Sequence, residues 1–355
     1  ETPTFEFFDV FGKQVGTTPS RELYKFFDRE GNTLVLRPDF TPSIARAASM
    51  YYHQEDMPIR LCYSGNTFVN RSSYQGRLKE STQMGVELLG DASVDGDGEI
   101  IAMTVELLKA AGLKEFQISI GQVDFFKALV DDSGMSEETI QELRQLISNK
   151  NYFGVEEMVE GMHLNDTLKK LFSLLGSFET QVEELAEAKS LASDYPNILS
   201  AITDLEKLGS FLRLYGIEKY VSFELGIISN YHYYTGIIFA GYTFGTGEPV
   251  VKGGRYDRLL TYFGRKAPAI GFAIVVDQLL SALSRQKITL PSEEKNQMIV
   301  YAENKIAEAV EKAKELRAQG ISVSLIQMQE GRSKDDYLSY AMKDHVSKVE
   351  FIEEA

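Results

Sequence analysis

The sequence has one cysteine, four histidines and no long apolar run. The lone Cys62 cannot support a disulfide framework, which fits a reducing cytosol, and its place in an apolar run predicts a core residue. The histidines lack the spacing of a zinc site, so no metal is expected. Without about 18 consecutive apolar residues no membrane-spanning helix is predicted, and no secretory signal peptide is recognisable.

Positive charge is also scarce. The 355 residues include 37 Lys and Arg against 52 Asp and Glu, a net charge of −15. Affinity for nucleic acid comes largely from Lys and Arg that contact phosphates, so this balance speaks against a nucleic-acid partner. With 43% hydrophobic residues, the chain is long enough for two or three globular domains.

Residues 63–90 are predicted to form an antiparallel hairpin, because two β-favouring runs flank a Ser/Gly-rich connector at 72–76. Alternation along the second strand places Gln83 and Glu87 on one face, with Gly85 between them. An amide and a carboxylate on one face can bind an amine or an imidazole N–H. A solvated strand face without a ligand is the alternative interpretation.

A strand-to-helix junction is predicted before Pro42, which favours the first helical turn and makes Thr41 the N-cap. Asp39 and Thr41 are then two oxygen-bearing side chains at one junction. They form either a capping pair or part of a ligand site.

The run 231–242 is predicted to be a strand rich in tyrosine, so at least one of Tyr233 and Tyr234 faces inward. A buried tyrosine hydroxyl needs a partner, either a ligand or a polar group of the core. The segment Lys252–Asp257 contains two glycines that permit close backbone approach, but it lacks the Gly-Lys-Ser/Thr of a phosphate loop.

Four acidic residues cluster at Asp91, Asp95, Asp97 and Glu99. A calcium loop is one interpretation, but the full twelve-residue pattern is absent. The start of a helix, where acidic side chains are favoured, explains the cluster more simply.

The order of the predicted elements indicates an α+β fold in three parts. Residues 122–215 show only helical periodicity and are predicted to be a helical insertion. Residues 1–121 and 216–288 supply the strands on either side of it. Strands and helices then alternate again, which predicts a small α/β domain at 292–355.

Four segments, in order, closely resemble the catalytic domain of class II histidyl-tRNA synthetases: LRPDFTPSIAR, GRLKESTQMGVELLG, YHYYTG and GGRYDRLL…APAIGFAI. The resemblance covers nearly all of residues 1–285, and the tail resembles a reduced anticodon-binding fold. It implies an antiparallel sheet of about six strands with flanking helices, and a dimer built partly through the first motif. The chain begins inside that motif, so the dimer element is expected to be incomplete.

The departures from this family concern the residues that handle ATP. Val69 stands where the second motif has an arginine, and Arg71 stands where it has a glutamate. Ser229 and Gln278 replace two further arginines of the family. Because adenylate formation gathers negative charge on the phosphate, the chain is not expected to activate an amino acid.

The amino-acid contacts of the family are largely kept. The resemblance assigns Asp39, Thr41 and Gln83 to the α-amino group of histidine, and Glu87 and Tyr234 to its imidazole. The whole predicted histidine-binding set is Asp39, Thr41, Arg77, Gln83, Glu87, Tyr233 and Tyr234. The partner of the histidine carboxylate stays open between Arg77, Arg71 and a group of another protein.

One synthetase-like family combines these features, the regulatory subunits of ATP phosphoribosyltransferase, the first enzyme of histidine biosynthesis. The chain resembles it closely, including RPDFTPSIAR. The resemblance implies a non-catalytic cytoplasmic protein without a cofactor, which dimerises and joins the short catalytic subunit in a hetero-octamer. It would be required for activity and take part in feedback inhibition by L-histidine. A divergent histidyl-tRNA synthetase and a synthetase-like scaffold without a ligand are the alternatives.

Overall fold

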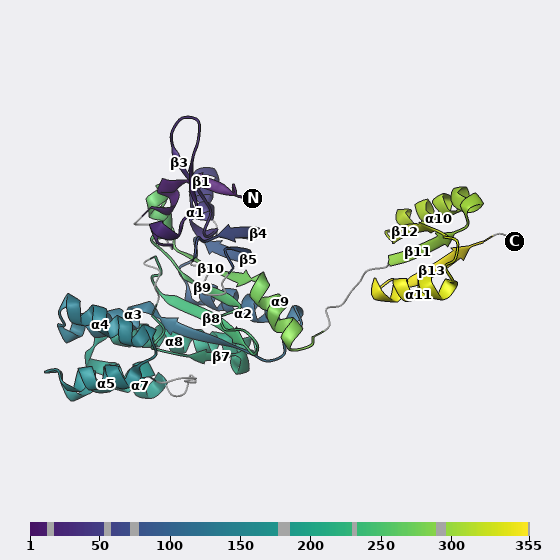
Figure 1. The fold of residues 1–355 in the computed structure, drawn as a ribbon. Coiled ribbons are helices and arrows are strands. Elements are labelled where there is room, and N and C mark those ends of the chain that lie inside the picture. Colours follow the sequence, from purple (N-terminus) through teal and green to yellow (C-terminus); the bar gives the residue numbers. More distant parts are fainter. Residues whose placement is uncertain are drawn as a thin grey trace. The chain divides into compact units, whose positions relative to one another are not determined.

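The structure is a computed structural model that describes residues 1–12, 18–52, 58–71, 78–176, 185–228, 233–288 and 296–353. The chain divides into two compact units, Glu1–Thr289 and Leu290–Ala355 (Figure 1). In the described part of the chain, no helix combines the length and the apolar character needed to cross a membrane.

The strands of the first unit are β1 (Phe5–Phe7), β2 (Lys25–Phe27), β3 (Thr33–Leu36), β4 (Ile59–Phe68), β5 (Glu80–Leu89), β6 (Phe116–Gln122), β7 (Val221–Phe223), β8 (Ile237–Thr243), β9 (Val251–Arg255) and β10 (Ala269–Val275). Its helices are α1 (Thr41–Tyr51), α2 (Val94–Ala110), α3 (Val123–Ser133), α4 (Glu137–Ser148), α5 (Tyr152–Glu160), α6 (Asp166–Ser173), α7 (Leu185–Leu191), α8 (Pro196–Leu214) and α9 (Val276–Arg285). The second unit contains β11 (Asn296–Tyr301), α10 (Ile306–Ala318), β12 (Ser322–Gln327), α11 (Lys334–Lys343) and β13 (Lys348–Ile352).

The main sheet of the first unit has the strand order β4-β5-β10-β9-β8-β6-β7. Its neighbours are antiparallel except for β6 and β7, which run parallel. The expected antiparallel sheet is therefore confirmed except at this edge, where the pairing of β6 with β7 makes the sheet mixed. Two parallel strands must be connected by a long crossover. Here the chain from α3 to α8 forms the connection between β6 and β7.

The predicted hairpin is confirmed as β4 and β5, which pair in antiparallel register from Ile59 opposite Leu89 to Phe68 opposite Glu80. The predicted connector at 72–76 lies outside the described residues. Strand β4 forms one edge of the sheet, and Cys62 on it is exposed, so the prediction of a core cysteine was wrong. The apolar run around Cys62 is a strand with alternating exposure rather than a fully buried one.

One face of the main sheet packs against helices and forms the largest hydrophobic core. Leu88, Ile118 and Phe272 of the sheet join this core together with residues of α2, α3 and α8. Helix α8 also packs against α2 and α3, as Figure 1 shows. Because the helical segment shares the core of the sheet, its division into a separate insertion stays a proposal.

The second unit is a parallel three-stranded sheet in the order β12-β11-β13 with two helices. Adjacent residues of β11 face opposite sides. Ile299 packs with Ala313 of α10, whereas Met298 packs with Tyr337 of α11. The predicted alternation of strands and helices in this region is confirmed.

Candidate functional site

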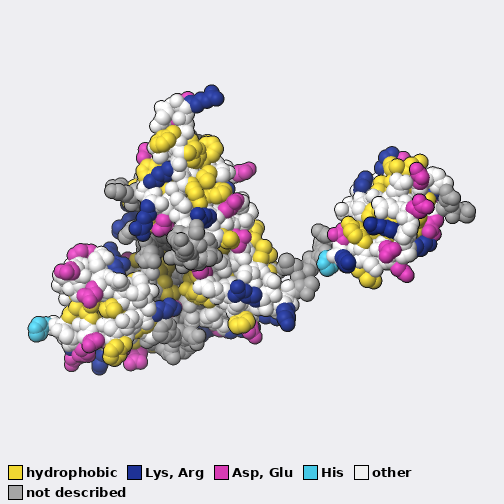
Figure 2. Space-filling view, in the orientation of Figure 1, with side chains coloured by type: hydrophobic (Ala, Val, Ile, Leu, Met, Phe, Trp, Pro, Cys, Tyr) yellow, Lys and Arg dark blue, Asp and Glu magenta, His cyan; other side chains and the backbone are white. Residues whose placement is uncertain are grey.

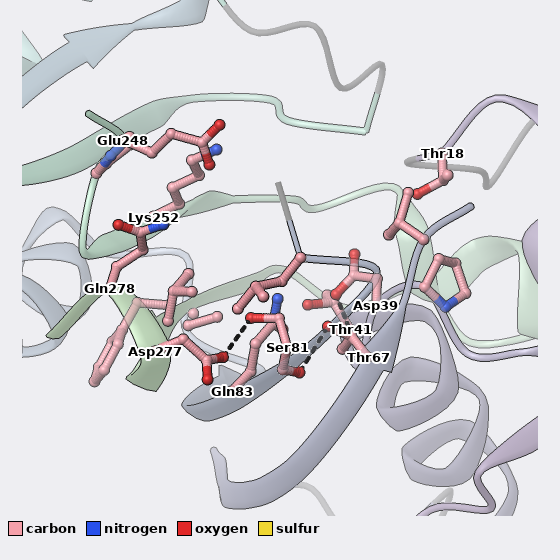
Figure 3. Close-up of a pocket in the computed structure, with 18 of the residues that line it drawn as sticks. Thr18, Asp39, Thr41, Thr67, Ser81, Gln83, Glu248, Lys252, Asp277 and Gln278 are labelled. Carbon is pink, nitrogen blue, oxygen red and sulfur yellow. Dashed lines mark hydrogen bonds between the residues drawn. The ribbon is translucent and has the colours of Figure 1, made fainter. Parts of the chain in front are cut away.

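The sheet face opposite the main core carries a cavity of about 630 Å³ (Figure 3). Its floor is hollow because several residues of neighbouring strands are glycines. A Cβ atom on Gly271 would lie 1.7 Å from Oε2 of Glu87, and one on Gly85 would lie 2.3 Å from the Tyr63 hydroxyl. Both values are far inside contact distance, so only glycine lets these side chains lie flat against the sheet.

Glu87 is the buried acid of this floor, with 1% of its surface exposed. Thr41 Oγ1 donates a hydrogen bond to Glu87 Oε1 at 3.0 Å, and the Tyr256 hydroxyl donates to Oε2 at 2.5 Å. Burial raises the pKa of Glu87 to about 8, although the two hydrogen bonds act in the opposite direction. Each carboxylate oxygen has a second lone pair, so Glu87 can still accept a hydrogen bond from a ligand.

The raised pKa of Glu87 predicts a pH-dependent change in stability. Because the folded state holds this proton to about pH 8, against an ordinary value of 4.5, the contribution of Glu87 to the free energy of unfolding is present below pH 4.5 and is lost as the pH rises through 8. Glu87→Gln cannot titrate. We expect its free energy of unfolding, relative to wild type, to rise across this window by at most about 1.4 kcal/mol per pH unit.

Urea denaturation of both proteins from about pH 5 to about pH 9 measures this difference directly. The contributions of all other titrating groups cancel in the comparison. Two curves that run parallel over the whole range would contradict the raised pKa of Glu87.

Asp39 and Thr41 take separate roles at the start of α1. The Asp39 carboxylate accepts a hydrogen bond from the Thr41 backbone N–H at 3.2 Å. The predicted N-cap was wrong, because Phe40 holds this position and makes no side-chain cap bond. The Thr41 side chain does not cap the helix. Its hydroxyl instead points into the cavity, where it donates the hydrogen bond to Glu87.

Gln83 presents an acceptor to the cavity. Its Oε1 atom is buried and has no hydrogen-bond partner among the residues that the structure describes. A buried acceptor without a donor costs about 1–3 kcal/mol, and a ligand ammonium group would remove that cost. Gln83 lies on the same strand and face as Glu87, as the alternation predicted.

The tyrosines form a wall beside Glu87. Tyr233 is 8% exposed, and its ring lies 4.7 Å from that of Tyr234 and 5.9 Å from that of Tyr256, measured between centroids. At least one inward-facing tyrosine was predicted, and Tyr233 confirms this. The strand begins later than predicted, since β8 starts at Ile237.

The structure brings most of the predicted site residues together. The members of the set that line this cavity are Asp39, Thr41, Gln83, Glu87, Tyr233 and Tyr234. Arg77 and Ser229 lie outside the described residues. The sequence reasoning missed Tyr256 as a partner of Glu87. The available signal was the glycine pair just before Arg255 and Tyr256, because close strand packing there carries the next large side chain to the cavity floor.

The other end of the cavity carries the positions that depart from the synthetases. Val69 and Gln278 both line it, and neither side chain is charged. Asp277, the first acidic residue of α9, accepts hydrogen bonds from Ser81 Oγ at 2.9 Å and from the Thr82 backbone N–H at 2.8 Å. Asp277 therefore joins α9 to β5.

Arg255 connects the end of β9 to the start of α2. Its Nε donates to Asp97 Oδ1 at 2.9 Å, and the backbone carbonyls of Asp91 and Ser93 accept from its other nitrogens. Asp97 is 3% exposed, and burial raises its pKa to about 6 despite the opposing effect of Arg255. Desolvation thus raises the pKa of Asp97, and the nearby guanidinium charge lowers it by a smaller amount.

The acidic cluster is the start of α2, as the simpler interpretation predicted. Ser93 is the N-cap and accepts from the Gly96 N–H, while Asp95 and Asp97 occupy the first turn. Within the described ranges, no three His, Cys, Asp or Glu side chains gather in a group that could hold a metal ion.

The chain is similar to known proteins over most of its length. The family model of histidyl-tRNA synthetase matches residues 1–279. The ATP phosphoribosyltransferase regulatory subunit of Acetivibrio thermocellus is 39% identical over 329 residues, which cover 92% of this chain and 78% of that protein. The regulatory subunit of the same name from Ruminiclostridium cellulolyticum is 37% identical over 352 residues, covering 99% and 83%.

A solved structure gives the same result for the fold. The crystal structure of an ATP phosphoribosyltransferase regulatory subunit/histidyl-tRNA synthetase from Bacillus halodurans matches with a TM-score of 0.85 and 35% identity. The match covers 100% of this chain and 89% of that chain. The predicted class II synthetase-like fold is confirmed, with a mixed main sheet.

Proposed function

The chain belongs to the ATP phosphoribosyltransferase regulatory subunits, which share the fold of histidyl-tRNA synthetases, and we propose that it senses L-histidine for that enzyme. It partners with the catalytic subunit and is itself not catalytic. In this proposal the partner is the short form of the catalytic subunit, which requires the chain for activity. Histidine, the end product of the pathway, binds the cavity and lowers that activity.

The observation that carries the proposal is the buried carboxyl group of Glu87 at the cavity floor. Glu87 accepts hydrogen bonds from two hydroxyls and keeps lone pairs for a third donor. An imidazole N–H can be that donor, whether the ring is neutral or protonated. Tyr234 lines the same cavity and offers a hydroxyl for the second ring nitrogen. A site with two such partners rejects isosteres that lack the ring nitrogens, since its polar groups would then stay unpaired.

The amine side of the cavity supports the same ligand. The Gln83 Oε1 atom lacks a donor in the described structure, and the Asp39 carboxylate lies on the same cavity wall. An α-ammonium group supplies donors for both. The ligand that satisfies the two ends together is an amino acid with an imidazole side chain.

The uncharged Val69 and Gln278 oppose the alternative of a divergent synthetase. Removal of one donor that stabilises transition-state charge costs about 10²–10³ in rate, so loss of several leaves no useful adenylate formation. The aminoacylation residues are accordingly proposed to be lost at Val69, Ser229 and Gln278.

Self-association of this subunit is part of the proposal. Figure 2 shows hydrophobic side chains gathered over the elements near the N-terminus. The exposed ones include Phe7 of β1, Phe27 of β2 and Tyr51 at the end of α1. An apolar surface of this kind supports burial against a second copy, within a hetero-octamer with the catalytic subunit.

Feedback then follows from linkage. Histidine shifts the complex only as far as it binds the less active state better than the more active one. The test is an assay of the short catalytic subunit with and without the chain, at increasing L-histidine. We expect activity only with the chain, inhibition by histidine, and inhibition lost but activation kept with Glu87→Gln.

Two outcomes would contradict the proposal. If histidine inhibits equally with Glu87→Gln, the response does not depend on this cavity. If the chain catalyses histidine-dependent exchange of pyrophosphate into ATP, it is a synthetase and not a regulatory subunit.

A further inference from the structure

An amino-acid ligand brings its own carboxylate into a cavity that already contains the acidic side chains of Asp39 and Glu87. Such a group needs a cationic partner, because a carboxylate taken from water without one is costly. Val69 and Gln278 cannot provide that charge. The cationic side chains that line the cavity, among the described residues, are Arg71, Lys79, Lys252 and Arg285.

Lys252 belongs to the cavity floor. It lies opposite Ala273 of β10, which in turn lies opposite Gly85 of β5. Two residues along β9, Gly254 lies opposite Gly271 of β10, and Gly271 lies opposite Glu87 of β5. Since residues two apart in a strand face the same side, Lys252 and Glu87 project from one face of the sheet.

The distance between these two residues suits an amino acid. Strands about 4.8 Å apart and a rise of about 3.3 Å per residue put the Cα atoms of Lys252 and Glu87 about 12 Å apart in the plane of the sheet. Between the two side chains, β10 contributes only Gly271, over which the Glu87 carboxyl lies, and the small Ala273, and both line the cavity. The Tyr63 hydroxyl covers Gly85 beside them. A ligand can therefore contact Glu87 with its ring and Lys252 with its carboxylate.

The other cations are less well placed. Lys79 accepts a backbone hydrogen bond from Val69 near the far end of the hairpin, eight residues before Glu87, or about 26 Å along an extended strand. Arg71 follows Val69 at that end. Arg285 donates to the carbonyl oxygen of Gly245 at 2.8 Å.

Glu248 completes the arrangement. It lines the same cavity as Lys252, and in Figure 3 the ammonium end of Lys252 points toward the Glu248 carboxylate. A carboxylate of the protein thus lies beside the lysine where a ligand carboxylate would bind. We propose that Lys252 binds the α-carboxylate of the ligand and that this carboxylate replaces Glu248. The inference rests on the proposed histidine-binding function.

Ligands with and without a carboxylate test this exchange. L-histidine, L-histidinol and histamine are titrated calorimetrically into the chain together with its short catalytic subunit. Wild type is expected to prefer L-histidine. Lys252→Met should weaken L-histidine binding about tenfold or more, leave the other two ligands unchanged and so remove the preference. Glu248→Gln removes the competing carboxylate and should tighten L-histidine binding about threefold to tenfold.

Matched variants locate the effect. Lys79→Met removes a lysine from the same cavity and should keep the preference for L-histidine, as should Arg71→Met. Thermal melting confirms that each variant is folded; all three cationic side chains lie at the cavity surface. A Lys252→Met protein that keeps the full preference would overturn the inference, and so would loss of the preference in Arg71→Met.

Different results would contradict the proposed histidine site and the assignment of Lys252 to the ligand carboxylate. If wild type binds L-histidine and Glu87→Gln does not, while Lys252→Met behaves as wild type, only the assignment of the carboxylate is wrong. If wild type binds no L-histidine, both the proposed function and this inference are wrong.

Discussion

Replacement of Arg255 by methionine is expected to lower the free energy of unfolding by about 3–5 kcal/mol. Arg255 and Asp97 are 6% and 3% exposed, and their closest contact is 2.6 Å. Methionine preserves much of the side-chain volume but leaves the Asp97 carboxylate buried without its cation. It also leaves the carbonyl oxygens of Asp91 and Ser93 without these donors. Urea denaturation at neutral pH measures the loss.

The ion pair between Arg60 and Glu99 is a matched control, because Glu99 lies on α2, as Asp97 does. Arg60 contacts Glu99 of α2 through two hydrogen bonds, at 3.1 and 2.8 Å, but its side chain is 54% exposed. Solvent-exposed ion pairs contribute about 0–1 kcal/mol, so Arg60→Met should change the free energy of unfolding by less than about 1 kcal/mol. Equal losses in both variants would show that burial of the Arg255 pair has no special effect.

The pH dependence of the Arg255→Met variant identifies the cause of its loss. Without the guanidinium, burial alone acts on Asp97 and raises its pKa further above the ordinary 3.8. A group whose folded pKa is raised stabilises the fold below its unfolded pKa and loses that contribution as the pH rises. The deficit against wild type should therefore be smaller near pH 4 than near pH 7. A deficit that does not change with pH would point to packing rather than charge.

Local patterns were sufficient to predict the elements that surround the site. Period-2 alternation placed Gln83 and Glu87 on one strand face, and the structure pairs that strand in the predicted hairpin. The acidic cluster likewise indicated the start of α2. These predictions depend on neighbours within a few residues, which is the range over which side-chain periodicity and capping act.

The contacts that complete the site could not be predicted in this way. Thr41 and Glu87 are 46 residues apart in sequence, and Glu87 and Tyr256 are 169 apart. Their hydrogen bonds depend on strand order, because β10 lies between β5 and β9 and brings Gly271 beneath the carboxylate. The same dependence on tertiary order explains the parallel β7, since local sequence does not show which strand becomes its neighbour.

The second large effect concerns Glu87 and the ligand. Glu87→Gln keeps the size of the side chain and a carbonyl acceptor for one hydroxyl, but it cannot ionise when L-histidine binds, so no negative charge can form opposite the imidazole. Loss of a hydrogen bond to a charged group, together with an amide N–H that opposes a ring N–H, should weaken L-histidine binding about 100-fold or more. Relative to wild type, the stability of the variant should be highest at the upper end of the pH window, so thermal melting of both proteins near pH 8 separates lost binding from lost structure.

Glu99→Gln is the matched control, because it neutralises a partly exposed carboxylate on α2 that is paired with Arg60 rather than lining the cavity. It should bind L-histidine as wild type does. The most direct test is calorimetric titration of L-histidine into wild type, Glu87→Gln and Glu99→Gln, each with the short catalytic subunit. Saturable binding to wild type and Glu99→Gln, abolished in Glu87→Gln, is the predicted result; equal binding by all three, or no binding by wild type, would contradict a histidine site in this cavity.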